Sequence, residues 1–293
     1  MHTMIRAYQE YLDAERNYSS HTLDAYRNDL EQLAGFLKSH HIDSWSDVRR
    51  ETLRTWLRTL FEAGTAKKSI ARKIASTRSF FKFLRRKDVV LSNPALSLVS
   101  PRLERKLPVY LDEGAMERML AIPDRSTEDG RRDAAILELF YSTGMRLSEL
   151  VNLNIGDVDY AGGTVKVRGK GRKERILPLG SKALDALRAY GKTALPDHAD
   201  AGSPLFYGAS GKRTYPMAIT RLVRRYIQEV SEIEKKSPHV IRHSFATHML
   251  NHGADLRAVK ELLGHESLST TQVYTHVSTE RMKKVYRQAH PKA

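Results

Sequence analysis

The chain of 293 residues contains no cysteine. This absence excludes a disulfide-stapled scaffold, a thiolate metal site and a cysteine nucleophile. No segment approaches the ~20 consecutive apolar residues of a membrane-spanning helix, and the N-terminus lacks the apolar core of a secretion signal. We therefore expect a folded protein that acts in the cytoplasm and has no membrane partner.

Acidic residues are few relative to basic ones, and the formal net charge is +15. Such an excess favours polyanionic partners, nucleic acid first, although it also fits a merely basic protein. The imbalance peaks between positions 64 and 87, where nine lysines or arginines occur without any acid. A solvated helix face usually alternates in sign, so this run favours phosphate binding. The side chains expected to face solvent and contact DNA are Lys67, Lys68, Arg72, Lys73, Arg78 and Lys82.

The hydrophobic pattern divides the chain into two parts joined by a proline-rich stretch. Residues 1–91 carry apolar side chains at helical spacing, which predicts a helical domain. Residues 92–108 contain three prolines and several charges, and we expect an interdomain linker. Residues 109–293 are mostly helical in pattern, but Val165 and Val167 alternate beside a glycine-rich turn, as in a hairpin. The predicted fold is mainly α with a small β-hairpin or sheet in the second domain.

A histidine pair, His239 and His243, has the four-residue spacing of a zinc site on a helix. A zincin helix needs His-Glu-x-x-His, but here Val240 replaces the acid and Arg242 adds a cation. This argues against a metal. His239 and Arg242 share a helix face, where arginine suits phosphate oxygens and histidine can exchange a proton. The simpler alternative is a histidine that caps or packs, and for His243 we expect a hydrogen bond in the core or behind the site.

Other segments strengthen the phosphate interpretation. Arg146 follows a Thr-Gly break, and Glu149 is placed three residues later to hold its guanidinium group. Lys170 lies at the glycine-flanked tip of the predicted hairpin. His265 follows a helix-ending glycine, and Tyr274 comes nine residues later.

These segments together resemble the tyrosine recombinase (phage integrase) family, and in particular its Xer-type members. The motifs "TGMRLSEL", "GKGRKER", "HVIRHSFATHMLNHGADLRAVKELLGH" and "STTQVYTHV" are similar nearly word for word, and "SSHTLDAYRNDL" resembles the family's core-binding domain. The motif positions in family order are Arg146, Lys170, His239, Arg242, His265 and Tyr274. The resemblance implies a two-domain DNA clamp, in which an N-terminal helical SAM-like core-binding domain precedes a C-terminal tyrosine recombinase catalytic domain.

The resemblance also implies a mechanism that uses no metal, ATP or other cofactor. Tyr274 would attack a DNA phosphodiester and form a 3′-phosphotyrosyl link, which a 5′-hydroxyl later reverses. The two motif arginines would stabilise charge on the non-bridging oxygens, helped by a hydrogen bond from His265. His239 would help to remove the tyrosine proton, and Lys170 would protonate the leaving oxygen.

The implied partners are a double-stranded recombination site and a homo- or hetero-tetramer of protomers on two duplexes. A second Xer-type recombinase and a septal DNA translocase are further partners that the resemblance suggests, with chromosome or plasmid dimers as the substrate at cell division. The tail from 278 to 293 would dock on a neighbour, the alternative being its own domain. Additional DNA contacts are expected from Arg221, Arg224 and Arg225.

Three other functions stay open at this point. The same chemistry would suit a mobile-element integrase or a topoisomerase-like nickase. A DNA-binding protein that lost catalysis would keep the fold, and a metallohydrolase would need bound zinc.

Overall fold

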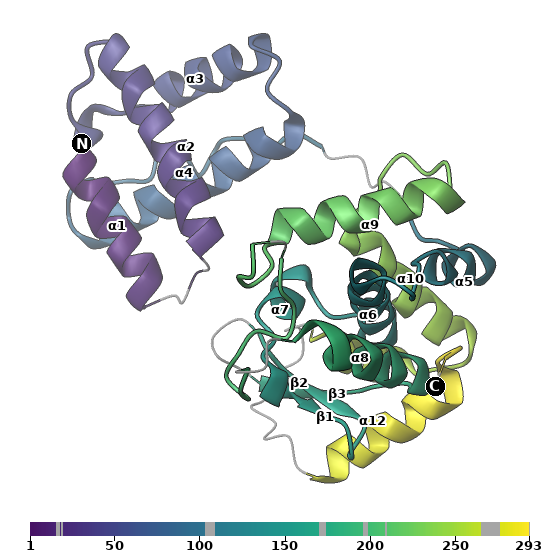
Figure 1. Ribbon diagram of the computed structural model, residues 1–293. Coiled ribbons are helices and arrows are strands. Elements are labelled where there is room, and N and C mark those ends of the chain that lie inside the picture. The colour runs from purple at the N-terminus through teal and green to yellow at the C-terminus, as the bar shows by residue number, and fades with distance from the viewer. Residues whose placement is uncertain are drawn as a thin grey trace. The chain divides into compact units, whose positions relative to one another are not determined.

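The computed structural model describes residues 1–15, 18, 20–102, 109–169, 174–195, 199–208, 210–264 and 276–292. The chain separates into unit 1, Met1–Lys106, and unit 2, Leu107–Ala293, each with its own hydrophobic core. The fold class is the predicted one: both units are mainly helical, and the described part of unit 2 contains one small sheet (Figure 1). No helix in the described ranges is long and apolar enough to cross a membrane.

The described residues of unit 1 form four α-helices around an aromatic core. Its helices are α1 (His2–Ala14), α2 (Ser20–Ser39), α3 (Arg50–Glu62) and α4 (Lys67–Arg86), with the short helix η1 at Trp45–Asp47. The rings of Tyr8, Trp45 and Phe80 are almost fully buried, and those of Tyr8 and Trp45 each meet the Phe80 ring edge to face. Because these large side chains come from three separate elements, they fix how the elements pack. Ile70 and Ile74 of α4 are completely buried, in agreement with the helical spacing of apolar residues in this part of the sequence.

The segment after α4 packs on unit 1 more closely than a linker would. Ala95 and Leu98 are buried in the core of this unit. Arg78 donates from Nε to the carbonyl oxygen of Ala95 and also bonds the carbonyl of Leu98, while Asn93 donates back to the carbonyl of Arg78. The buried side chains of Ala95 and Leu98 thus tie the first part of the expected linker to unit 1.

Unit 2 is built around helix α6 (Glu128–Thr143), which is buried on all sides along most of its length. A helix surrounded by apolar neighbours belongs in the interior. In Figure 1, α6 lies between α9 on one side of the unit and α12 on the other. The remaining helices are α5 (Glu113–Ala121), α7 (Leu147–Val151), η2 (Ile155–Asp157), α8 (Ser181–Ala194), α9 (Pro216–Val230), α10 (Pro238–Asn251), α11 (Leu256–Leu263) and α12 (His276–Ala289). Helix α5 is capped by Asp112, whose Oδ1 accepts the amide of Ala115 at 2.7 Å.

The sheet of unit 2 is antiparallel, in the order β1 (Val158–Asp159), β2 (Thr164–Arg168) and β3 (Glu174–Pro178). Val165 pairs with Leu177, and Val167 pairs with Arg175. Since alternate residues of a strand share a face, the buried face of β3 carries Arg175 together with Leu177. Ile176 lies on the opposite face and is only partly buried.

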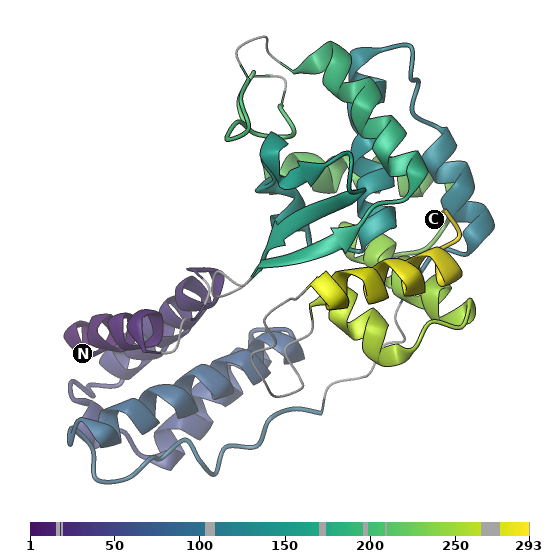
Figure 2. The ribbon, with the colours of Figure 1, turned by 90° about the horizontal axis from the view of Figure 1, so that it is seen from below.

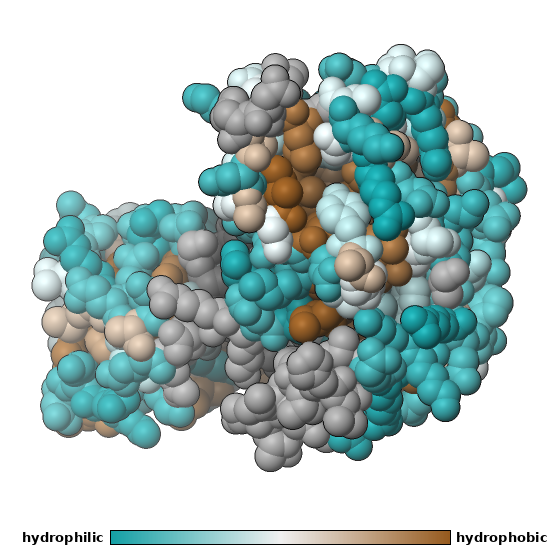
Figure 3. Space-filling view, turned by 60° about the horizontal axis from the view of Figure 1, so that its bottom comes forward, coloured by the Kyte–Doolittle hydropathy of each residue, from teal (hydrophilic) through white to brown (hydrophobic). Residues whose placement is uncertain are grey.

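Helix α12 packs along β3 and against α10 and α11 of its own unit (Figure 2). Tyr286 is 2 % exposed, and its hydroxyl lies 2.7 Å from Oγ of Ser142 on α6. His290 stacks on the Tyr286 ring and bonds through Nε2 to the carbonyl oxygen of Tyr141. In the single chain, the tail thus occupies its own domain, which was the alternative to docking on a neighbour. Hydrophilic residues cover most of the face of the units shown in Figure 3.

Candidate active site

Arg146 is fixed at the start of α7 by the residue that the sequence singled out. Oε2 of Glu149 accepts the backbone N–H of Arg146 at 2.6 Å, and Oε1 accepts Nη1 of its guanidinium at 2.9 Å. Glu149 therefore both caps the helix and orients the arginine, as the three-residue spacing suggested. The preceding Gly144 ends α6 with φ of +57°, and a Cβ there would lie 2.4 Å from Cδ1 of Phe245. Only glycine fits this sharp turn into the arginine.

Arg242 lies on α10 and is 8 % exposed. Its Nη1 donates to the carbonyl oxygen of Gly144 at 2.6 Å, and its Nη2 donates to that of Leu263 at 2.8 Å. Nη2 of Arg146 donates to the next carbonyl, that of Gly264, at 2.8 Å. The two motif arginines, which are far apart in the sequence, therefore bind consecutive carbonyls at the end of α11. Each guanidinium has five N–H donors, so an arginine can hold a carbonyl and still reach a phosphate.

The guanidinium of Arg146 lies close enough to affect the ionisation of Arg242. Burial and the positive charge of Arg146 lower the pKa of Arg242 to about 10, so it stays protonated at neutral pH. Burial alone would raise the pKa of Glu149, but its ion pairs with Arg175 and Arg146 lower it below the ordinary value. The permanent negative charge of Glu149 thus partly offsets the repulsion between the arginines. The result is a cationic site that is held together before any anion binds.

His239 is the second residue of α10, one turn before Arg242, and its side chain is exposed. Partial burial of the ring and the positive charges of His243, Lys235, Arg242 and Arg146 lower its pKa below the ordinary ~6.5. At neutral pH the imidazole is therefore mostly neutral and can accept a proton. This places a base beside the arginine pair.

His243 was expected to form a hydrogen bond either in the core or behind the site. Its side chain is exposed, so a place in the core was wrong. The buried histidine of this helix is His248, which lies 2.9 Å from both the hydroxyl of Tyr141 and the carbonyl oxygen of Leu111. Within the part of the chain that the structure describes, no group of three or more histidines and acids is arranged to hold a metal ion.

Arg175 belongs to this site and was missed in the sequence. It is 6 % exposed, and its Nη1 and Nη2 donate to Oε1 and Oε2 of Glu149 at 2.7 and 2.8 Å. Its Nε donates to the carbonyl oxygen of Leu262 at 3.1 Å. One signal could have found it: on β3 it shares the buried face with Leu177, and a buried arginine requires an anionic partner.

Three motif residues, Lys170, His265 and Tyr274, lie outside the described residues. Their flanks are described. Strands β2 and β3 flank the positions around Lys170, and Gly264 with α12 flanks the segment that contains His265 and Tyr274. The structure thus brings Arg146, His239 and Arg242 to one site with Glu149, next to the point where the tyrosine segment begins.

The basic residues predicted to contact DNA from unit 1 fall into two groups. Lys67, Lys68 and Lys82 are exposed, as expected. The exposure expected of Lys73 was wrong: it is 8 % exposed, and its Nζ lies 2.8 Å from Oδ1 of the fully buried Asp29. Arg72, whose side chain is 40 % exposed, bonds Asp29 through Nη1 at 2.6 Å. Arg78, farther along the helix, is partly buried and bonds backbone carbonyls of the chain after α4. Arg72 and Lys73 are held by a buried carboxylate, so none of these three cations projects freely into solvent.

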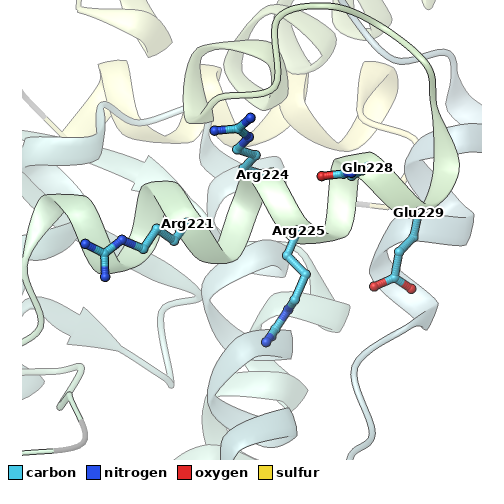
Figure 4. A pocket seen from close by; sticks show the side chains of 5 residues that line it. All are labelled: Arg221, Arg224, Arg225, Gln228 and Glu229. Atoms are coloured by element: carbon cyan, nitrogen blue, oxygen red, sulfur yellow. The ribbon is translucent and has the colours of Figure 1, made fainter.

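Helix α9 carries the basic residues proposed for unit 2. Arg221, Arg224 and Arg225 are exposed and line a shallow hollow with Gln228 and Glu229 (Figure 4). The figure shows Arg224 and Arg225 pointing to opposite sides of the helix, with Arg221 about one turn earlier.

Arg225 is the one of these three that a carboxylate of α6 holds in place. Its Nη2 donates to Oδ2 of the buried Asp133 at 2.6 Å, and it lies over the ring of Tyr226, 4.7 Å from the centroid. The Tyr226 hydroxyl donates to the same Oδ2 at 2.9 Å. Arg225 is thus positioned before any ligand arrives.

The comparisons with known proteins agree with the geometry of this site. Residues 109–281 match the phage integrase family, and residues 5–88 match the phage integrase N-terminal SAM-like domain. The chain is 46% identical to the tyrosine recombinase XerC of Pelobacter propionicus, with 99% of this chain and 95% of that protein covered. It is 40% identical to the tyrosine recombinase XerD of Staphylococcus aureus, over the whole of both chains.

A solved structure shares the fold. The XerH site-specific recombinase bound to palindromic difH substrate, in a post-cleavage complex, superposes with a TM-score of 0.71 at 23% identity. The match covers 92% of this chain and 80% of that one. From the family match over most of its length and its identity to Xer proteins, the chain belongs to the phage integrase family, as a tyrosine recombinase of the Xer type.

Proposed function

We propose that this recombinase cleaves and rejoins DNA strands at a specific site, with Tyr274 as the nucleophile. The observation that carries the proposal is the arginine pair. Arg146 and Arg242 bind consecutive carbonyls of α11, and a histidine with a lowered pKa lies one turn away. That cationic site adjoins the segment containing the tyrosine.

The chemical step exchanges one phosphodiester for another. The Tyr274 oxygen attacks phosphorus and takes the 3′-phosphate, and the 5′-oxygen leaves as a hydroxyl. A 5′-hydroxyl of another strand then attacks the phosphotyrosine, and the tyrosine leaves. The bond energy is kept through both steps, so the reaction requires neither ATP nor a redox partner.

Two arginines suit the pentavalent transition state of this step. Negative charge builds on the non-bridging oxygens, where guanidinium groups donate charge-assisted hydrogen bonds. Arg146 and Arg242 are held by carbonyls and by Glu149, so they need not reorganise when the charge appears. His265 would add a hydrogen bond to the same oxygens.

Proton transfer is divided between two residues. A phenol has a pKa near ~10, so Tyr274 must lose its proton to attack. His239, neutral at pH 7, is the proposed acceptor. Lys170, which lies between β2 and β3 in the sequence, is the proposed donor to the leaving 5′-oxygen.

The DNA partner is a duplex that carries the recombination site. The exposed side chains of Lys67, Lys68 and Lys82 would bind phosphates from unit 1, and Arg221 and Arg224 would bind them from unit 2. Residues 1–91 would form the core-binding domain, 109–293 the catalytic domain, and the stretch between them the connection of a clamp.

Exchange between two duplexes requires four protomers. The partner protomers are either copies of this chain or a paralogous Xer-type recombinase, and the C-terminal tail would dock on a neighbour within that tetramer. The substrate we propose is a chromosome or plasmid dimer at cell division, with a septal DNA translocase as the activating partner.

The test is a covalent-trapping assay in excess EDTA. A nicked duplex with the dimer-resolution site of the source chromosome is incubated with the protein, and adducts that survive denaturant are counted. The Tyr274→Phe variant should form none. Tyr215→Phe is the matched control, because Tyr215 is an exposed tyrosine outside the site, and should form the adduct normally. An adduct that persists in Tyr274→Phe would assign the nucleophile to another tyrosine, and dependence on added metal would contradict the mechanism.

A further inference from the structure

The carbonyl groups at the C-terminal end of α11 all accept hydrogen bonds, each from an identifiable donor. A helix ends with carbonyls that lack partners within the helix. Those of Lys260 and Glu261 accept the N–H of Gly264, which caps the helix. The next three, of Leu262, Leu263 and Gly264, each accept a guanidinium N–H from a different arginine.

The three arginines come from different elements of unit 2. Arg242 is on α10, Arg146 caps α7, and Arg175 is on β3. The carbonyl end of a helix carries partial negative charge, so three cations there are electrostatically favourable. Two of the three are proposed to clamp the phosphate, whereas Arg175 is 6 % exposed and points its donors at protein groups.

All three nitrogens of the Arg175 guanidinium donate hydrogen bonds. Both terminal nitrogens bond the two oxygens of Glu149, and Nε bonds the Leu262 carbonyl. The same Glu149 holds Arg146. A Cβ at Gly264, where φ is +67°, would lie 3.2 Å from Cζ of Arg175, so the guanidinium also packs closely on the backbone of the cap.

We propose that Arg175 is a positioning residue for strand cleavage: it joins the Glu149–Arg146 pair to the end of α11 from which the nucleophile segment begins. This inference rests on the proposed function. Arg175 thereby fixes the position of the phosphate clamp, Arg146 and Arg242, relative to the segment that contains the tyrosine. It acts through Glu149 and Leu262 and does not itself contact the DNA phosphate.

Lysine cannot replace this arginine. An ammonium group keeps the charge that Glu149 needs, but it cannot bond both carboxylate oxygens and the carbonyl of Leu262 in one plane. Arg175→Lys should therefore fold, with the same melting temperature within a few degrees, and bind its site with unchanged affinity. Its single-turnover cleavage rate at saturating protein should fall about 10²-fold, the cost of a small misplacement of reacting groups.

A second measurement distinguishes a defect in the phosphate-binding arginines from a defect in protonation of the leaving oxygen. A substrate with sulfur at the 5′-bridging position releases a thiolate that needs no proton, because a thiol is far more acidic than an alcohol. Lys170→Ala should be restored by this substrate. Arg175→Lys should not be restored, because its defect lies in the phosphate clamp and the nucleophile segment.

A second variant tests the route through Glu149. If Arg175 acts through this carboxylate, Glu149→Gln combined with Arg175→Lys should be no slower than the slower single variant. Losses that multiply would show that the two side chains act independently and would overturn this route.

Four results would overturn the proposal. They are wild-type cleavage by Arg175→Lys, its rescue by the sulfur substrate, multiplying losses in the double variant, and a parallel fall in affinity and melting temperature that marks a structural role alone. The proposed nucleophile is judged separately: an adduct in Tyr274→Phe would refute that assignment, while the rate loss in Arg175→Lys would still be measured from the wild-type adduct.

Discussion

Two buried carboxylates, Asp29 in unit 1 and Glu149 in unit 2, each hold two cationic side chains. Asp29 binds Arg72 and Lys73, both neighbours on α4, and it also accepts the hydroxyl of Ser76. Glu149 binds Arg175 on β3 and Arg146 at the start of its own helix. The local chemistry is the same, but the two clusters differ in what they connect.

The Asp29 cluster fastens one helix to another. It joins α2 to α4, draws Lys73 of the basic run into the interior and ties the partly exposed Arg72 to the same carboxylate. The Glu149 cluster instead reaches a helix end, and Arg146 extends from it to the carbonyl of Gly264. The comparison teaches that a cation near a buried acid is structural when all its partners lie on packed helix faces. It supports chemistry when it is held at the rim of a site where charge develops.

Loss of Arg242 should give the largest effect. Arg242→Met removes the charge that the transition state requires, so cleavage should slow about 10³-fold. DNA affinity should change little. Single-turnover adduct formation measures the rate, and filter binding measures the affinity.

The matched control is Arg213→Met. Arg213 also donates to backbone carbonyls, those of Val151 and Leu153, but it has no assigned catalytic role. A comparable cleavage loss in this control would show that bonding to carbonyls, and not charge at the phosphate, explains the Arg242 effect.

Breaking the cluster of unit 1 should affect stability and not the chemistry. Asp29→Ala leaves Lys73 buried without its carboxylate and should cost about 3 kcal/mol of unfolding free energy. Asp24→Ala removes only an exposed pair with Arg27 and should cost little. Urea unfolding of the full chain distinguishes them. Equal stability of the two variants would contradict a structural role for Asp29.

The pH dependence of cleavage should reflect His239. Its pKa lies below the ordinary ~6.5, and it acts as a base when neutral, so the rate should be constant at neutral pH and fall as pH drops through that lowered pKa. His239→Gln should lose this acid limb and about 10²-fold in rate. His243→Gln is the control, since His243 is exposed on the same helix, and should keep the limb. An unchanged acid limb in His239→Gln would assign it to another group.

The smallest effect should come from the exposed lysines of α4. Lys67→Ala with Lys68→Ala should weaken binding several-fold and reduce the slope of log affinity against log salt by about 2. Lys38→Ala, which changes an exposed lysine outside the acid-free run, should leave the slope nearly unchanged. An unaltered slope in the double variant would remove this end of α4 from the DNA interface.

Much of the fold could be predicted from local patterns in the sequence. Helical spacing predicted the helical fold of residues 1–91, and the three-residue interval predicted the contact of Glu149 with Arg146. Such features depend on a few neighbouring residues, so a single sequence contains them. The alternation of Val165 and Val167 likewise predicted a strand with one buried face.

The sequence by itself determined the residue types and the short-range geometry of the site. Only the tertiary structure decided which basic residues remain free. It buried Lys73 against Asp29, 44 positions away in the sequence, and it placed Arg175 against a helix end 87 positions away. Contacts of that range arise from packing between elements, and the charge pattern of one segment contains no information about the acid or carbonyl that another will bring to it.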